Sequence, residues 1–280
     1  MKQRLRLTLR SSSPIPIEVE GVLPERVEKL SLLEVGKLPV RHGNRREELG
    51  AFFDVAGDPA TGWIQFAGDT RNVKHIGAGL SRGSVTVESN AGMHAGARMS
   101  GGSLIIDDSA GDWLGAEMRG GFIDVRHCAG DQCGAAYRGS RRGMTGGMIL
   151  VRRSAGDELG LLMRRGLIVI GRDCGEFGGA SMTAGTVFVV GTAGARLGAG
   201  MKRGTIVAGG VTELPLSFRH SCEYRPSFLH FYAAKLRKWQ ASVPEYLERG
   251  PLHCYRGDVL HGGTGEVLTP TAGIRPAGTS

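Results

Sequence analysis

The sequence predicts an all-β fold, a right-handed parallel β-helix in which coils of about 19 residues stack on one another. Three periodic features of the 280-residue chain support this fold. Glycine recurs with gaps of 19, 19, 26, 19, 19 and 19 residues, at Gly83, Gly102, Gly121, Gly147, Gly166, Gly185 and Gly204. A second glycine series has gaps of 19, 19, 19, 26, 19 and 19 residues, with its long gap in the same coil, at Gly77, Gly96, Gly115, Gly134, Gly160, Gly179 and Gly198. Three residues before each glycine of the first series stand Leu80, Met99, Met118, Met144, Met163, Met182 and Met201.

A short β-branched run follows each glycine of the first series, as in Ile123-Asp124-Val125. The second and fourth residues after the glycine are apolar in every coil, which predicts that these two positions face the interior. The runs are too short for helices and are bounded by glycine, so they are typical of strands. One strand per coil predicts parallel ladders with strands about 4.8 Å apart, and parallel crossovers are right-handed.

The interior of such a stack is narrow. Glycine at the corners permits positive φ and a close approach of successive coils, and the methionine column fills the space between them. A second interior column is expected at Ala95, Leu114, Cys133, Leu159 and Leu197. Cys133 is therefore interpreted as a core residue and not as a ligand.

Both ends of a β-helix expose strand edges and need caps. We expect an N-terminal cap over residues 1–37, the β-helix over 38–211 and a C-terminal helix and extended tail over 212–280. The N-terminal cap offers an alternating strand around Leu7 and a helix after Pro24. An irregular first coil is expected through Phe52 and Trp63, so that the stack begins near residue 40. Ser227 is the expected N-cap of a helix that runs to about Trp239. That helix should bury Phe228, Phe231, Tyr232, Leu236 and Trp239. After residue 248 the chain is weakly patterned and is expected to be extended or ordered by a partner.

The third residue after each glycine should point outward. This column changes from Thr86, Ile105 and Asp124 to Leu150, Val169, Phe188 and Val207. An outward apolar column predicts a cover, which is either the C-terminal helix or another chain.

The net charge of +8 favours an acidic partner, which can be nucleic acid, an anionic coenzyme or an acidic subunit. Five cysteines without C-x-x-C spacing argue against a disulfide framework and a zinc ribbon. This cysteine usage, with no apolar stretch long enough to cross a membrane, predicts a cytoplasmic protein.

Seven extra residues, 137–143, account for the 26-residue gap and should project from the wall. Their arginines, Arg138, Arg141 and Arg142, suit carboxylate or phosphate groups. Further cations recur at one turn of the stack, at Arg82, Arg119, Arg164, Arg165, Lys202 and Arg203. This basic stripe is either an interface or a solvated face. An acidic column at another corner could neutralise it internally, at Asp112, Asp131, Asp157 and Glu176.

No catalytic and no metal-binding residues are identified. His75 and His94 lie one coil apart, but no carboxylate or cysteine accompanies them. Cys128 lacks a neighbouring base. Each glycine precedes another strand and not a helix, which excludes a dinucleotide-binding loop. The sequence contains no Walker motif and no recognisable Ser/His/Asp set.

Several segments closely resemble the C subunit of formylmethanofuran dehydrogenase over about residues 38–210. They include Ala91-Gly92-Met93-His94-Ala95-Gly96-Ala97, Ala110-Gly111-Asp112-Trp113-Leu114-Gly115, Gly134-Ala135-Ala136-Tyr137 and Gly200-Met201-Lys202-Arg203-Gly204. The insertion lies in the matching coil. More distantly, the repeat is similar to the C-terminal β-helix domain of the glutamate synthase large subunit, which is structural.

The resemblance implies a one-carbon enzyme complex that handles formyl groups on methanofuran, a coenzyme with glutamyl carboxylates. In that family, metals and the coenzyme's chemistry belong to other subunits, so this chain is expected to bind no cofactor itself. The Arg-rich, Lys-poor composition favours the bacterial formyltransferase/hydrolase complex, in which an amidohydrolase-like subunit and a formyltransferase subunit are the expected partners. The chain would then be a non-catalytic scaffold whose basic residues guide the anionic coenzyme.

Two alternatives remain open. The chain can be the C subunit of a molybdenum- or tungsten-containing formylmethanofuran dehydrogenase, or a free-standing solenoid that binds anions or nucleic acid. Nucleic acid is disfavoured because only Phe122 and Tyr137 offer aromatic rings near the basic stripe.

Overall fold

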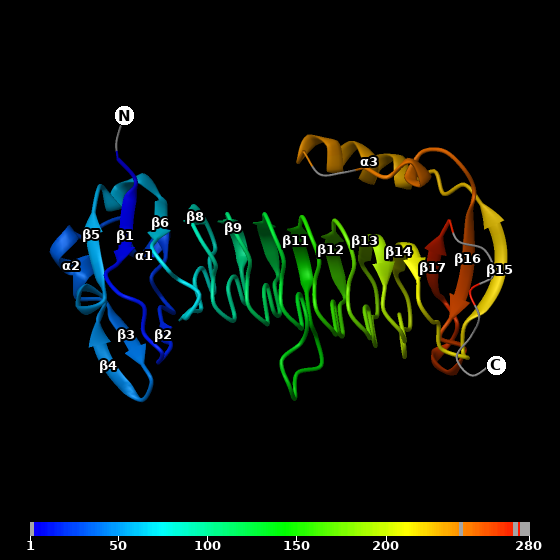
Figure 1. The fold of residues 1–280 in the computed structure, drawn as a ribbon, viewed down its shortest axis with the longest axis horizontal. Helices are drawn as coiled ribbons and strands as arrows, with labels where there is room; N and C mark the ends of the chain where they lie inside the picture. The colour runs from blue at the N-terminus through cyan, green and yellow to red at the C-terminus, as the bar shows by residue number, and fades with distance from the viewer. Residues whose placement is uncertain (1–2, 241–242, 271–273, 275–280) are drawn as a thin grey trace.

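A long parallel ladder of strands forms the body of the protein (Figure 1). The structure is a computed structural model that describes residues 3–240, 243–270 and 274. It is an all-β fold with one 13-stranded sheet and one 4-stranded sheet. The parallel part of the large sheet consists of β6 (Trp63–Ala67), β8 (Ser84–Val87), β9 (Ser100–Ile106), β10 (Gly120–Val125), β11 (Thr145–Val151), β12 (Arg165–Ile170), β13 (Thr186–Ala193) and β14 (Thr205–Val211). The seven predicted strands of the glycine repeat are confirmed.

Equivalent residues of successive repeats pair in one register. Val85 pairs with Leu104, and Leu104 pairs with Ile123. The 26-residue repeat keeps this register, because Ile123 pairs with Ile149 and the extra residues leave the ladder. On another side of each repeat, isolated parallel bridges form a second ladder, through Ala91, Ala110, Ala129, Ala155, Cys174 and Ala193. Each repeat is thus hydrogen-bonded to its neighbours at two places.

The space between these two ladders is filled by the predicted interior columns. The leucine and the six methionines that precede the first glycine series are all fully buried. Cys133 is 1% exposed, and burial raises the pKa of its thiol to about 12, so it is a core residue. Gly121 has φ +88°, and a Cβ there would lie 2.5 Å from the carbonyl oxygen of Gly101. A side chain at this corner would force two repeats apart.

The N-terminal end departs from the repeat. β1 (Leu5–Leu9) and α1 (Pro24–Val27) confirm the predicted strand and helix. β5 (Phe53–Ala56) pairs antiparallel with β1, whereas β6 pairs parallel with β1. The remaining elements are β2 (Ile17–Glu18), α2 (Leu32–Gly36), β3 (Pro39–His42), β4 (Arg45–Glu48), η1 (Leu49–Ala51), η2 (Pro59–Thr61) and β7 (Val73–Lys74). The expected first coil is therefore only partly found: β6, which contains Trp63, joins the parallel ladder, whereas β5, which follows Phe52, does not.

The C-terminal end contains more sheet than expected. β16 (Leu252–Gly257) and β17 (Gly265–Thr269) form within the region that was expected to be an extended or partner-ordered tail. β17 adds to β14 in parallel, and β15 (Arg219–Tyr224) pairs with β16 and forms the end strand of the sheet. This part of the tail is ordered by the chain itself, because its strands continue the main sheet. Short helices η3 (Glu245–Leu247) and η4 (Val259–His261) connect these elements.

Helix α3 (Leu229–Lys238) covers the outward apolar column (Figure 1). Leu150, Val169, Phe188 and Val207 are all at most 1% exposed and pack in one cluster with residues of α3. The rings of Phe188 and Tyr232 lie 4.9 Å apart. The predicted cover is confirmed, and it is this helix.

Two details of the predicted helix are wrong. Phe228, not Ser227, is the N-cap, and no side-chain hydrogen bond caps the helix, because residue 228 already has helical angles and Pro226 starts the turn. Phe231 is 76% exposed and lies outside the buried face.

An ion pair between buried Asp124 and partly buried Arg152 holds the C-terminal end of α3. Nε and Nη2 of Arg152 donate to the two carboxylate oxygens of Asp124 at 3.0 and 2.9 Å. Arg152 also donates to the carbonyls of Trp239 and Gln240, at 3.0 and 2.9 Å. A cation at this end satisfies the last free carbonyls of the helix and its dipole. Within the described ranges, no helix is both long enough and apolar enough to cross a membrane.

Replacing Phe188 with Asp should destabilise the protein by at least about 3 kcal/mol, since it removes a buried ring and places a carboxylate beneath α3. Urea unfolding of the isolated chain measures this. Phe231→Asp on the exposed side of the same helix is the control and should unfold like the wild type. Equal stability of both variants would contradict the packing of α3 described here.

Candidate functional site

The inserted residues 137–143 project from the ladder on the side away from α3 (Figure 1). The insertion is anchored at its first residue, Tyr137. This ring stacks on Trp113 with centroids 4.9 Å apart, and its hydroxyl lies 2.9 Å from Nδ1 of His94. Arg98 lies 5.2 Å from the same ring. Tyr137 therefore holds the insertion against the wall, and Arg138, Arg141 and Arg142 beyond it are exposed.

Tyr137 completes a column of rings that belongs to the repeat. His75 and His94 stack with centroids 4.7 Å apart and an interplanar angle of 11°. His75, His94 and Trp113 all adopt φ near +60°, as their equivalent positions require. A cavity of about 290 Å³ lies beside the column and is lined by Glu20, His75, Ala78, Gly79, His94, Ala97, Arg98 and Tyr137.

Burial keeps this column uncharged. It lowers the pKa of His94 to about 4, helped by the nearby charges of His75 and Lys74. Burial also lowers the pKa of His75 and raises the pKa of Tyr137 to about 12. At neutral pH the rings are therefore neutral and suited to stacking. No group of three or more His, Cys, Asp or Glu side chains within the described residues is arranged to hold a metal ion.

The predicted basic residues meet in a groove beside the insertion. This basic groove has a volume of about 600 Å³ and is lined by Arg142, Thr145, Arg164, Arg165, Thr183, Ala184, Lys202 and Arg203. The five cations come from the insertion and from two other repeats. Strands about 4.8 Å apart place these charges within one Debye length of their neighbours at about 0.1 M salt. The cations therefore repel one another unless an anion lies between them.

A second groove of about 490 Å³ continues the first, because both share Arg142 and Thr145. It adds Arg119 and Arg141, and its acidic residue, Glu117, is bonded to Arg98 at 3.0 Å. Arg138 is exposed and lies outside both linings. The structure thus brings together six of the seven predicted site residues. None of the seven has an ion-pair partner in the part of the chain that the structure describes.

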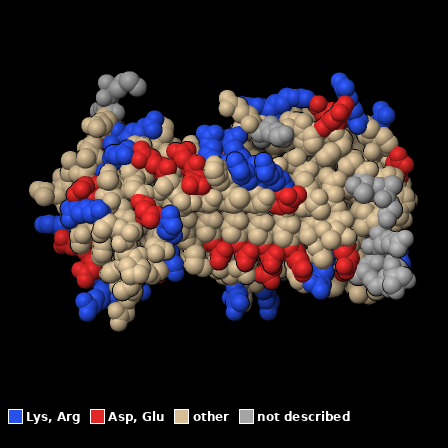
Figure 2. Space-filling view, in the orientation of Figure 1, with Lys and Arg blue, Asp and Glu red and all other residues tan. Residues whose placement is uncertain are grey.

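The acidic column does not neutralise these cations. The three aspartates bind the backbone of the next repeat: Asp112 accepts from the N–H of Asp131 at 2.9 Å, Asp131 from Asp157, and Asp157 from Glu176. The fourth carboxylate, Glu176, instead accepts from the Arg196 side chain at 2.6 Å. Figure 2 shows a row of acidic side chains along the stack and basic side chains that project below it. The possible internal neutralisation is not found, because backbone N–H groups bind the three aspartates and Arg196, which is not one of the predicted basic residues, binds Glu176. Arg82 also leaves the stripe, since it binds Glu28 at 2.6 Å.

The two aromatic candidates for base stacking are engaged elsewhere. Tyr137 stacks on Trp113, and Phe122 stacks on Trp239 of the α3 segment at 5.8 Å. These two roles, and the ion pair between Arg152 and Asp124, were not predicted from the sequence. The signal for Tyr137 was present, since the ring column of His94 and Trp113 leads to the start of the insertion.

Lowering the pH should destabilise the protein through the ring column. Folding lowers the pKa of His94 from 6.5 to about 4. The stability of the fold is therefore unaffected by this histidine above pH 6.5 and decreases as the pH falls from 6.5 toward 4, because protonation then favours the unfolded state. His94→Asn, which tolerates positive φ, should reduce the fall in melting temperature between about pH 7 and about pH 4.5. His127→Asn is a control because its side chain is 48% exposed. An unchanged pH slope in His94→Asn would contradict this assignment.

Comparison with known sequences gives one consistent group of relatives. No family model matches the chain. The C subunit of the molybdenum-containing formylmethanofuran dehydrogenase 1 of Methanothermobacter thermautotrophicus is 37% identical over 88 residues, which are 31% of this chain and 22% of that protein. The C subunit of the tungsten-containing formylmethanofuran dehydrogenase 2 of the same organism is 37% identical over 91 residues, 31% of this chain and 34% of that protein. The matched segment thus spans at most about a third of these two curated relatives.

A solved structure matches almost the whole chain. It is a chain in the crystal structure of the formyltransferase/hydrolase complex from Methylorubrum extorquens in complex with methylofuran. The TM-score is 0.90 and the sequence identity is 33%, and the match covers 95% of this chain and 99% of that chain. Together with the curated relatives, this similarity shows that the chain belongs to the family of formylmethanofuran dehydrogenase C subunits.

Proposed function

We propose that this chain is a non-catalytic scaffold subunit of a cytoplasmic formyltransferase/hydrolase complex. Such a complex transfers a formyl group from tetrahydromethanopterin to methanofuran and hydrolyses it to formate. The observation that carries the proposal is the 33% identity across 99% of a chain in such a complex. In support, the described residues contain no metal-ligand cluster, and the conspicuous cavity histidines are neutral and stacked.

The scaffold is proposed to be a right-handed parallel β-helix over residues 38–211, with a capping segment over 1–37 and a C-terminal region over 212–280. Two parallel ladders on different sides of each repeat support this architecture. Such a stack is rigid along its length because each repeat is bonded to the next, which suits a subunit that holds others in place.

The basic groove is the proposed contact for acidic groups. Arg138, Arg141 and Arg142 of the insertion, with Arg164, Arg165, Lys202 and Arg203 of the repeats, present unneutralised charge to one side of the molecule. Guanidinium forks bind carboxylates in bidentate geometry. The coenzyme's glutamyl carboxylates, or acidic side chains of a partner subunit, have the matching chemistry.

Metals and coenzyme chemistry are assigned to partner subunits, one resembling amidohydrolases and one a formyltransferase. A second candidate is the equivalent subunit of a molybdenum- or tungsten-containing formylmethanofuran dehydrogenase, which the curated relatives favour. Purifying the untagged complex from its native cells and identifying the subunits decides between them. Molybdopterin and iron–sulfur subunits would support the dehydrogenase, and recovery of this chain alone would contradict both.

Replacing Arg138, Arg141 and Arg142 together with alanine should leave the fold intact and weaken coenzyme affinity or subunit assembly. Exposed charge contacts contribute about 0.2–1 kcal/mol each, so the loss should be at least about threefold at low salt. The difference between variant and wild type should shrink as the salt concentration rises, because screening already weakens coenzyme affinity or subunit assembly in the wild type. Alanine at three other exposed arginines, Arg153, Arg172 and Arg219, is the matched control. Wild-type turnover and assembly at every salt concentration would contradict a role for the insertion.

The isolated chain should hold no stoichiometric metal and should not hydrolyse formylmethanofuran, because its cysteines and histidines lack ligand geometry. Elemental analysis and a formate-release assay measure these two properties. One tightly bound zinc or molybdenum per chain would contradict the scaffold proposal.

A further inference from the structure

The basic groove has a hollow between two pairs of cations. Three successive repeats contribute to it, in order, Arg164 and Arg165, Thr183 and Ala184, and Lys202 and Arg203. Strands about 4.8 Å apart place the two cationic pairs about 10 Å from each other along the stack. The middle repeat has short side chains at the equivalent positions, so space is left between the pairs. An acidic group that enters this space lies close to both pairs.

The charges that line the groove have one sign. Its lining contains five cations, and all of them are exposed and without an ion-pair partner among the described residues. The second groove adds Arg119 and Arg141, and its acidic residue, Glu117, is already bonded to Arg98. The excess positive charge of the two joined grooves therefore favours an acidic occupant.

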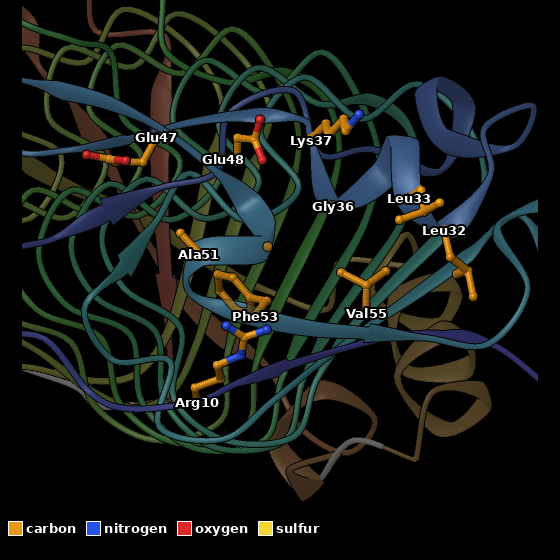
Figure 3. Close-up of a pocket in the computed structure, with 11 residues that line it drawn as sticks. Arg10, Leu32, Leu33, Gly36, Lys37, Glu47, Glu48, Ala51, Phe53 and Val55 are labelled. Atoms are coloured by element: carbon orange, nitrogen blue, oxygen red, sulfur yellow. The ribbon is translucent and has the colours of Figure 1, made fainter.

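A pocket at the N-terminal end provides a contrast (Figure 3). It has a volume of about 670 Å³, and its lining includes Arg10 and Lys37 as well as Glu47 and Glu48. These positive and negative charges balance, so they favour neither an acidic nor a basic occupant. The basic groove differs because its charge is not balanced by its own lining.

An apolar segment follows the groove at the same corner of the stack. β17 pairs with β14 so that Glu266 lies opposite Thr205, and η4 comes just before β17. The Thr264 hydroxyl donates to the carbonyl of Lys202, which is part of the groove. In Figure 1 the chain before β17 lies on the same side of the stack as the insertion. The η4 segment thus continues the corner of the groove by one repeat.

Three large apolar side chains are exposed at this end of the groove. Val259 and Leu260 of η4 are 49% and 80% exposed. Leu216 is 58% exposed and lies beside η4, because the Val259 N–H donates to the Ser217 carbonyl at 3.1 Å. We call Leu216, Val259 and Leu260 the apolar patch. A chain of glutamyl carboxylates has no apolar group to cover this patch, whereas a protein segment can carry acidic and apolar side chains together.

We infer that the basic groove and the apolar patch together bind one acidic segment of a partner subunit. Its carboxylates lie over Thr183 and Ala184, between the two pairs of cations, and an apolar side chain of the same segment packs on Leu260. From the insertion to η4 the distance is four repeats, or about 19 Å, which about six residues of extended chain can span. The inference rests on the proposed function, because the segment belongs to a subunit of the complex. It assigns the groove to subunit assembly and not to the coenzyme.

Photo-cross-linking in the assembled complex tests the inference directly. Benzoylphenylalanine takes the place of Leu260, whose exposure tolerates the change, and mass spectrometry identifies the linked peptide. The expected product is a peptide of another subunit with several Asp or Glu side chains within about six residues of the linked position. A linked peptide without acidic residues, a peptide from a second copy of this chain, or the absence of any linked peptide would overturn the inference.

Two variants test the groove and the patch separately. The double variant Arg165→Glu with Arg203→Glu reverses one charge of each cationic pair, and Leu260→Asp places a carboxylate on the apolar patch. Each should lower recovery of the partner subunit at least about tenfold at low salt. The loss in the double variant should become smaller as the salt concentration rises, because salt screens exposed charges.

Matched controls place the same kinds of change on other surfaces. Arg153→Glu with Arg172→Glu reverses two exposed arginines that follow β11 and β12. Phe231→Asp changes an apolar residue of α3 that is 76% exposed. Both controls should recover the partner subunit as the wild type does. A loss in the controls as large as that in the test variants would overturn the assignment of the interface to this groove.

The outcomes also separate this inference from the proposed function. Full recovery of the partner with both test variants overturns the inference and leaves the scaffold function standing. If recovery is unchanged and the double variant instead raises the KM for the coenzyme, the groove is a coenzyme site and the inference is wrong. A wild-type chain that recovers no partner contradicts the scaffold function itself.

Discussion

The register of the parallel ladder is the constraint on which the rest of the structure depends. Val85, Leu104, Ile123 and Ile149 occupy equivalent positions of successive repeats and pair with one another in turn. All remaining equivalent positions must therefore also stack in columns. A shift of one residue would turn the interior residues outward. The insertion shows how strong this constraint is, since seven extra residues are expelled from the wall and the register continues unchanged.

Stacking also brings like-charged groups of successive repeats close together, so that they repel one another. The aspartate column resolves this repulsion within the chain, because each carboxylate accepts a backbone hydrogen bond from the next repeat. The histidine column resolves it by staying neutral, since burial lowers the pKa values of both rings. The cations of the basic groove are neutralised in neither way within the described residues, so they repel one another unless anions from outside the chain lie between them.

The ends of the ladder are where the repeat stops determining structure. At the C-terminal end, β17 continues β14 and the chain returns through β15 and β16, while α3 seals the apolar column. At the N-terminal end, β1 and β5 extend the sheet and leave one edge facing a pocket. The protein thus has a regular body and irregular ends.

The sequence alone determined the strands, their register and the two interior columns, because the same pattern of glycine and apolar residues occurs in seven successive repeats. It also identified the insertion and the apolar column that needs a cover. Only the tertiary structure decided that α3 provides this cover, that Tyr137 anchors the insertion on Trp113, and that residues 252–269 return to the sheet. These contacts join segments that lie outside the repeat or far apart in the chain. Periodicity constrains neighbours one repeat apart, whereas the packing of unique segments depends on surfaces that exist only once the ladder has formed.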